Sequence, residues 1–192
     1  NADHGCVVVM ETKTGEVKAI SNLGRDEDGT YFETDNYAIK ESHEPGSTFK
    51  LIDLIALLDD KKVDTSKVYD SNGGTIHYYG KPVRDSKVGG YGKISLARGF
   101  ELSSNTVMVR AVYENYKSNP KQFVERINSY GLNKPLGLQF VGEGKPKIPQ
   151  PGTDDWSGIA LPWMAYGDGV SVTPLQTLAL DNAIANDGKM IK

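Results

Sequence analysis

Ser47 and Lys50 lie three residues apart at the start of an apolar segment, 49–58. If this segment is helical, residues i and i+3 share a face, so the lysine amine lies beside the serine hydroxyl. A serine hydroxyl is a weak nucleophile until a neighbouring base takes its proton, and a lysine whose pKa is lowered by apolar surroundings can be that base. Unpaired N–H groups at the helix start, including that of Ser47, can stabilise a forming oxyanion. The spacing therefore indicates acyl transfer, although it also fits an N-cap serine followed by a surface lysine.

A second pair of polar side chains lies further along the chain, in the triplet Ser103-Ser104-Asn105. The flanking segments, 94–102 and 106–116, are typical of helices, so the triplet is expected at their junction. Its hydroxyl and carboxamide could face one cleft, where Ser103 would relay a proton and Asn105 would hold a substrate amide. The alternative is structural, with Asn105 capping the start of the second helix.

Asp53 and the histidines are weaker candidates. Asp53 could pair with Lys50 at i, i+3, which would keep the lysine charged and weaken it as a base. We favour instead a solvent-facing Asp53 at an edge of the helix. His43 precedes Ser47 by four residues, but we do not expect it to act as the base. The histidines show no metal-ligand spacing, so no metal site is expected. They are His4, His43 and His77.

The elements that must position these residues are mostly helical. From Phe49 to Leu58 only two residues are polar, so this helix is expected to be central and covered on several sides. Residues 5–22 predict a β-hairpin with a glycine-containing turn at 13–16. Two polar, glycine-containing stretches, 24–36 and 70–92, predict loops, the second with a short hairpin. The sequence is therefore expected to form an α+β fold.

Two further helices are predicted from their start signals. Asn119-Pro120 has N-cap and N1 chemistry. Thr173, Pro174 and Gln176 form a capping box with proline at the first helical position. The helix after this box is expected to end at Asp187-Gly188, where glycine suits the left-handed backbone.

Composition restricts the class of protein. The chain has 192 residues, a net charge of −3 and no lysine or arginine run, which argues against nucleic acid as the main partner. Its single cysteine, Cys6, cannot form an intrachain disulfide and is expected to be a small buried hydrophobe. The longest apolar run is far shorter than the ~20 residues that span a bilayer. The first residue is Asn1, so we expect the chain to be part of a longer protein.

Taken together, the motifs resemble those of the class B penicillin-binding proteins, whose wider family of serine acyltransferases includes the serine β-lactamases. The family signature is S-x-x-K, an S-x-N type triplet and K-T-G. The first two are present as Ser47-Thr48-Phe49-Lys50 and Ser103-Ser104-Asn105. Other segments of the chain are also similar to this family, namely EPGSTFK, ELSSNTVM, YGDGVSVTPLQ, AIANDGK and the opening VVVMETKTGEVKAI. The resemblance runs from about residue 5 to the end.

The third motif departs from the family pattern. Lys13-Thr14-Gly15 precedes Ser47 and lies in the predicted hairpin turn, so we interpret it as turn chemistry. The family's K-T-G follows the S-x-N triplet on a strand that lines the cleft, and is expected beyond Lys192. The resemblance thus implies a single partial transpeptidase domain over 1–192. It would hold the mostly helical subdomain and the N-terminal hairpin of the central antiparallel sheet, without the C-terminal strands. Such a fragment is expected to be inactive or weak.

The resemblance implies a D,D-transpeptidase that cross-links peptidoglycan. Ser47 would attack the stem peptide, Lys50 would take its proton, Ser103 would pass a proton to the leaving amine, and Asn105 would position the peptide amide. Ser47 and Asn105 would therefore also bind substrate. No metal or organic cofactor is implied.

The implied partners are stem peptides ending in D-Ala-D-Ala, β-lactam antibiotics, and other cell-wall synthesis or division proteins. The implied location is the bacterial cell envelope, as the extracytoplasmic (periplasmic) domain of a protein anchored in the inner membrane. A role in division is favoured slightly over one in elongation.

Two alternatives remain open at this point. A serine β-lactamase or a β-lactam sensor uses the same serine–lysine pair, but a lactamase also needs a base for its deacylating water, and no clear Glu-bearing loop motif is present. The second alternative is a non-catalytic division scaffold, which would keep the fold and bind division partners without catalysing a reaction.

Overall fold

The computed structural model describes residues 2–139 and 141–191, and the fold is α+β. Its residues cluster into two compact units, which are described here one at a time. The first unit combines Asn1–His43, Tyr130–Lys147 and Ser171–Lys192, and the second combines Glu44–Ser129 and Ile148–Val170. Among the described residues, no helix is both long and apolar enough to cross a membrane.

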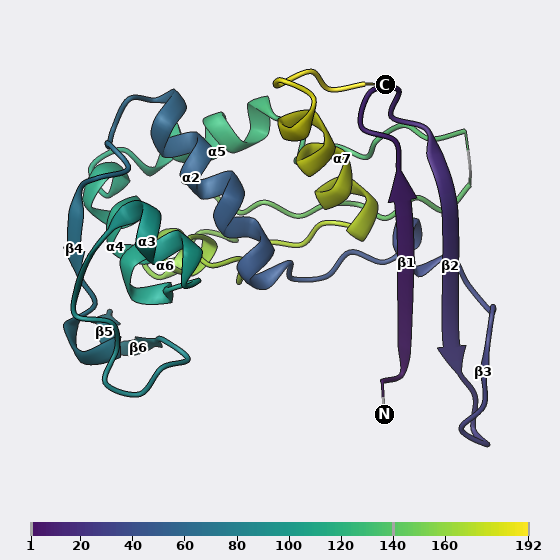
Figure 1. The fold of residues 1–192 in the computed structure, drawn as a ribbon, viewed down its shortest axis with the longest axis horizontal. Helices are drawn as coiled ribbons and strands as arrows, with labels where there is room; N and C mark the ends of the chain where they lie inside the picture. The colour runs from purple at the N-terminus through teal and green to yellow at the C-terminus, as the bar shows by residue number, and fades with distance from the viewer. Residues whose placement is uncertain (1, 140, 192) are drawn as a thin grey trace. The chain divides into compact units, whose positions relative to one another are not determined.

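The first unit is built on an antiparallel sheet with the strand order β1-β2-β3 (Figure 1). The strands are β1 (His4–Met10), β2 (Val17–Arg25) and β3 (Tyr31–Phe32). The hairpin predicted for residues 5–22 is confirmed, and Gly15 in its turn has φ +71°. The predicted loop 24–36 instead includes β3, which pairs two residues with the end of β2.

Two helices pack beside β1 in this unit, α1 (Tyr37–Lys40) and α7 (Pro174–Ala185) (Figure 1). The capping box predicted for α7 is confirmed. The hydroxyl of Thr173 accepts from the Gln176 backbone N–H at 3.1 Å, and the Gln176 side chain accepts from the Thr173 N–H at 2.9 Å. Both side chains are buried. The capping box therefore supplies hydrogen-bond partners for N–H groups at the start of α7 that water cannot reach.

The second unit is a helical cluster with two small sheets. Its helices are α2 (Lys50–Asp59), α3 (Leu96–Glu101), α4 (Asn105–Tyr116), α5 (Pro120–Ser129) and α6 (Ala160–Met164). Two short 3₁₀ helices, η1 (Gly46–Phe49) and η2 (Asn72–Gly74), precede α2 and β5. The strands are β4 (Val68–Asp70), β5 (Thr75–Tyr78), β6 (Lys81–Arg84) and β7 (Lys93–Ser95), paired β4 with β7 and β5 with β6. The predicted short hairpin within 70–92 is β5–β6.

The helix α4 contacts α2, α3, α5 and α6 and lies at the centre of this unit. At the far end of α2 the carboxylate of Asp60, 3% exposed, accepts from Tyr116 Oη at 2.9 Å and from Arg126 Nε at 2.7 Å. A buried carboxylate needs such charge-assisted partners. Because Tyr116 is on α4 and Arg126 on α5, this contact fixes α2 against both helices.

Candidate active site

The start of α2 places Ser47 and Lys50 on one side of the helix, as the spacing predicted. Ser47 lies in the 3₁₀ turn η1 and is exposed, whereas the Lys50 side chain is buried, with 1% of the residue exposed. Phe49, between them, is fully buried in the core. A solvent-facing hydroxyl therefore lies next to an amine that water hardly reaches.

Four oxygens surround the Lys50 amine. Nζ lies 3.1 Å from Ser47 Oγ, 3.0 Å from Ser103 Oγ, 2.7 Å from the Ser103 carbonyl oxygen and 2.5 Å from Asn105 Oδ1. An ammonium has only three protons to donate. The neutral amine has two protons and a lone pair, so one of the two hydroxyls can then donate its proton to the nitrogen. The structure thus brings together all four residues that the sequence singled out.

The junction between α3 and α4 orients Ser103 and Asn105. Ser103 has φ +52°, a left-handed backbone that is strained for a residue with a side chain and is concentrated at functional sites. Asn105 donates from Nδ2 to the Arg84 carbonyl at 2.8 Å, which turns Oδ1 toward the amine. The N-cap of α4 is Ser104, whose hydroxyl accepts from the Val107 N–H. The alternative that Asn105 caps this helix is therefore wrong.

Asp85, directly after β6, supports this junction and was not predicted from the sequence. Its carboxylate accepts from Ser104 Oγ at 3.0 Å, from the Thr106 N–H at 2.9 Å and from Thr106 Oγ1 at 2.8 Å. Ser104 and Thr106 are fully buried. No sequence signal marked this aspartate, because its function depends on contacts across twenty residues of loop and helix.

Burial sets the protonation of Lys50. Loss of hydration lowers the pKa of its amine to about 8, against the opposing effect of the charge on Asp85 and of the ionised form of Asp53. With a pKa near 8, roughly a tenth of the amine is neutral at pH 7. A lysine with an ordinary pKa would have almost none in that form, so this amine can accept a proton near neutral pH.

Asp53 is fully buried in α2, so the expected solvent-facing position is wrong. Its two carboxylate oxygens have no hydrogen-bond partner among the described residues. Burial raises the pKa of Asp53 well above its ordinary range, although Lys50 opposes the shift. This shift favours the neutral carboxyl of Asp53, which weakens its tendency to hold Lys50 in the charged form and so reduces the objection raised by its spacing.

Replacing Asp53 by asparagine is expected to stabilise the fold in a pH-dependent way. The folded state keeps a proton on Asp53 that the unfolded chain loses above about pH 4, so wild-type stability falls as pH rises above that value. Asp53→Asn has no such proton to keep. Its unfolding free energy in urea should exceed that of wild type by on the order of 1 kcal/mol at pH 7.5 and match it near pH 4. The exposed control Asp154→Asn should show no such trend, and a pH-independent difference for Asp53→Asn would contradict the assignment.

The turn 166–169 holds the loop before Ser47. The Gly46 N–H donates to the Gly167 carbonyl at 3.2 Å, and the Gly169 N–H donates to the Glu44 carboxylate at 2.8 Å. Gly167 has φ +85°, and a Cβ there would lie 2.0 Å from the Gly46 carbonyl oxygen. Only glycine fits this approach. The sequence analysis noted the similarity of this segment, YGDGVSVTPLQ, to the family, but did not predict that it contacts the serine loop.

The Lys13-Thr14-Gly15 triplet lies in the turn between β1 and β2, as predicted. Thr14 donates to the Glu11 side chain and accepts from the Glu16 N–H, which are contacts within the turn itself. Cys6 in β1 is half-buried rather than buried, and burial raises the pKa of its thiol.

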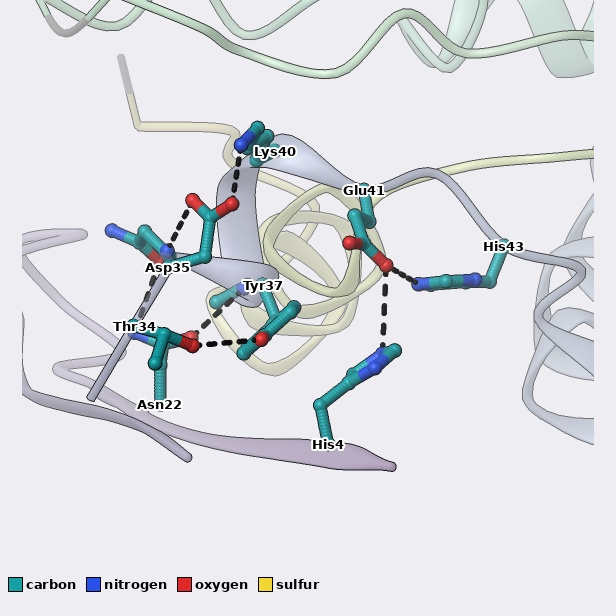
Figure 2. A network of polar contacts seen from close by, with 10 residues as sticks. His4, Asn22, Thr34, Asp35, Tyr37, Lys40, Glu41 and His43 are labelled. Carbon is teal, nitrogen blue, oxygen red and sulfur yellow. Dashed lines mark hydrogen bonds and ion pairs between the residues drawn. The ribbon is translucent and has the colours of Figure 1, made fainter. Parts of the chain in front are cut away.

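Two of the histidines come together in the first unit, contrary to the expectation of no metal-ligand arrangement. His4 in β1 and His43 after α1 both face the Glu41 carboxylate (Figure 2). Their separation in sequence hid this arrangement, because short-range spacing rules cannot detect ligands from distant segments.

The comparisons define the class of protein. The family model described as the penicillin binding protein transpeptidase domain matches residues 5–192, so the chain belongs to this family. The predicted α+β, transpeptidase-like fold is also confirmed. A crystal structure of a peptidoglycan glycosyltransferase from Burkholderia ambifaria aligns with a TM-score of 0.83 at 26% identity, over 98% of this chain and 55% of that one.

Among individual relatives, the chain is similar to penicillin-binding proteins of the transpeptidase type. It is 30% identical to the penicillin-binding protein PbpB of Mycolicibacterium smegmatis over 190 residues, which are 94% of this chain and 28% of PbpB. It is 29% identical to the peptidoglycan D,D-transpeptidase FtsI of Escherichia coli K12 over 192 aligned positions, 97% of this chain and 31% of FtsI. The chain thus spans less than a third of the length of each of these two relatives.

Proposed function

We propose that the protein containing this chain is a penicillin-binding serine D,D-transpeptidase that cross-links peptidoglycan stem peptides. The observation that carries the proposal is the buried Lys50 amine, which lies within hydrogen-bond distance of both the Ser47 and the Ser103 hydroxyls. An exposed nucleophile, an adjacent base and a second hydroxyl are the parts that acyl transfer through a serine requires. Membership in the transpeptidase family supports the same reaction.

In the first half of the reaction, Ser47 Oγ forms a bond to the carbonyl carbon of the penultimate D-alanine, and its proton moves to Lys50 Nζ. The bond from that carbon to the terminal D-alanine nitrogen then breaks, and the leaving nitrogen takes a proton through Ser103 Oγ. The Ser47 N–H contributes to the oxyanion site. The products are an acyl-enzyme on Ser47 and free D-alanine.

In the second half, the amine of another stem peptide attacks the acyl carbon. This amine loses a proton through Ser103 Oγ and Lys50 Nζ. The ester bond between the acyl carbon and Ser47 Oγ then breaks, Ser47 Oγ regains a proton, and the cross-linked peptide leaves. Asn105 positions the donor peptide amide, in keeping with its orientation by the Arg84 carbonyl. No metal or organic cofactor takes part.

The wider setting follows from the family and forms part of the proposal. The protein would act in the bacterial cell envelope, with this domain outside the cytoplasm and an anchor in the inner membrane. Its partners would be stem peptides ending in D-Ala-D-Ala, β-lactams that mimic them, and other cell-wall synthesis or division proteins. The relative named FtsI is itself called a peptidoglycan D,D-transpeptidase, which favours this setting.

Intact mass after addition of benzylpenicillin tests the function. The sample is the longest native polypeptide that contains residues 1–192, with the 192-residue chain in parallel. A transpeptidase is expected to gain one penicilloyl group that persists for many minutes, while the 192-residue chain reacts weakly or not at all. An adduct that clears within seconds would instead indicate a β-lactamase. A folded protein that never gains the adduct would contradict the proposal and support the alternative of a non-catalytic division scaffold.

A further inference from the structure

Three potential metal ligands converge in the first unit. His4 lies at the start of β1, while Glu41 and His43 follow α1. Glu41 Oε2 lies 3.5 Å from His4 Nε2 and 3.1 Å from His43 Nε2, and the three ligand atoms are all within 4.8 Å of one another. Figure 2 shows both imidazole rings pointing their nitrogens at the same carboxylate oxygen.

The surrounding structure holds these side chains in place. The His4 ring stacks on Tyr37, with 4.2 Å between ring centroids and 9° between planes. The His43 backbone exchanges two hydrogen bonds with Val172, each of 3.0 Å. The ammonium of Lys40 is paired with Asp35 rather than with Glu41 (Figure 2). The ligand atoms are therefore arranged by contacts that do not depend on an ion.

We propose that His4, Glu41 and His43 form a zinc-binding site. An ion about 2.0–2.1 Å from each nitrogen and oxygen in a tetrahedral site separates neighbouring ligand atoms by about 3.3 Å. The two distances to Glu41 Oε2 lie on either side of this value. The side chains are 33–50% exposed, so an ion can enter and water can complete its coordination.

The ligand types select the metal. Two imidazoles and one carboxylate are a ligand set that zinc uses in proteins, whereas Ca²⁺ and Mg²⁺ prefer oxygen ligands throughout. The bound ion would connect β1 to the segment after α1, two parts of the unit separated by more than thirty residues of chain. An ion bound by the folded state alone stabilises that state, so the site is structural and does not depend on the proposed transpeptidase function.

Isothermal titration with Zn²⁺ tests the site, using the 192-residue chain and four variants. Wild type is expected to bind one Zn²⁺, and His4→Gln and His43→Gln are each expected to bind at least tenfold more weakly. His77→Gln is the matched control, because His77 is the remaining histidine and is exposed. Cys6→Ser controls for the thiol. Both controls should bind as wild type does, and Mg²⁺ should give no binding signal.

Thermal unfolding supplies a readout that separates ion binding from misfolding. Zn²⁺ should raise the melting temperature of wild type and of both controls by several degrees, but not those of His4→Gln and His43→Gln. His43→Cys replaces one zinc ligand by another and should recover binding that His43→Gln loses. The proposal is overturned if wild type fails to bind Zn²⁺ at high micromolar concentration. It is equally overturned if folded His4→Gln and His43→Gln bind as wild type does.

Discussion

In the longest native polypeptide that contains residues 1–192, which is also the sample for the other acylation predictions below, Ser47→Ala is expected to abolish covalent labelling by benzylpenicillin. The hydroxyl of Ser47 is exposed and lies 3.1 Å from the buried Lys50 amine, so it is the nucleophile to which the acyl group is bonded in the proposed reaction. Alanine has no atom that can form this bond. The acylation rate should fall by at least about 10⁴-fold, below detection by intact mass, because the loss of a covalent nucleophile is among the largest single effects in enzymes.

The neighbouring hydroxyl provides a matched control. Thr48 is exposed and next in sequence, but its Oγ1 donates to the Pro45 carbonyl at 2.8 Å instead of contacting Lys50. Thr48→Ala should therefore keep the adduct at a rate within about threefold of wild type, a change of less than 1 kcal/mol in the barrier. An adduct that survives in Ser47→Ala, on protein with the wild-type circular dichroism spectrum, would show that another residue is the nucleophile.

Local sequence patterns identified the elements that carry the site. The i, i+3 spacing placed Ser47 beside Lys50 because helix geometry alone determines that relation. The capping box at Thr173 was equally local and was found for the same reason. The meeting of Ser103 and Asn105 with Lys50 could be inferred only from the resemblance, since those residues are more than fifty positions away.

The features that sequence analysis missed depend on tertiary contacts. Asp53 was expected to face solvent, because an aspartate in an apolar helix is usually placed at its edge, yet neighbouring elements cover α2 on that side as well. Asp85 acts through hydrogen bonds to residues of α4 and its N-cap. His4 and Glu41 come from a strand and a distant loop. None of these three relations leaves a periodic signal in the sequence.

The site combines a serine that solvent can reach with a lysine amine from which water is largely excluded. In the proposed reaction Ser47 must reach a substrate, and it is exposed, while the Lys50 amine can act as a base only if water does not keep it protonated. The fold meets both demands because the 3₁₀ turn η1 leaves Ser47 exposed, while Lys50, the first residue of α2, is buried. Each further partner of the amine is neutral, namely the two Ser103 oxygens and the Asn105 carboxamide. A carboxylate in direct contact would have raised the pKa of Lys50 and weakened the base.

Lys50→Met is therefore expected to lower the acylation rate by about 10³-fold, in the range attributed to loss of a general base. Methionine retains much of the side-chain volume but cannot accept the Ser47 proton. Lys50→Arg should be impaired as severely, because a guanidinium stays protonated throughout the accessible pH range. The exposed control Lys121→Met, on α5, should acylate as wild type does.

The pH profile of wild type distinguishes a base from a structural lysine. In the proposed reaction the neutral Lys50 amine is the reactive form, and burial lowers the pKa of this amine to about 8. The second-order rate of acylation should therefore rise about tenfold per pH unit below pH 7 and level off above about 8.5. Lys50→Met should lose this dependence, since it has no amine to deprotonate. A wild-type rate that is flat between pH 6 and 9, or a similar slope in Lys50→Met, would assign the base to another group. In that case Ser103 Oγ, although it lies 3.0 Å from the Lys50 amine, would receive the proton that it passes to the leaving amine from a group other than Lys50.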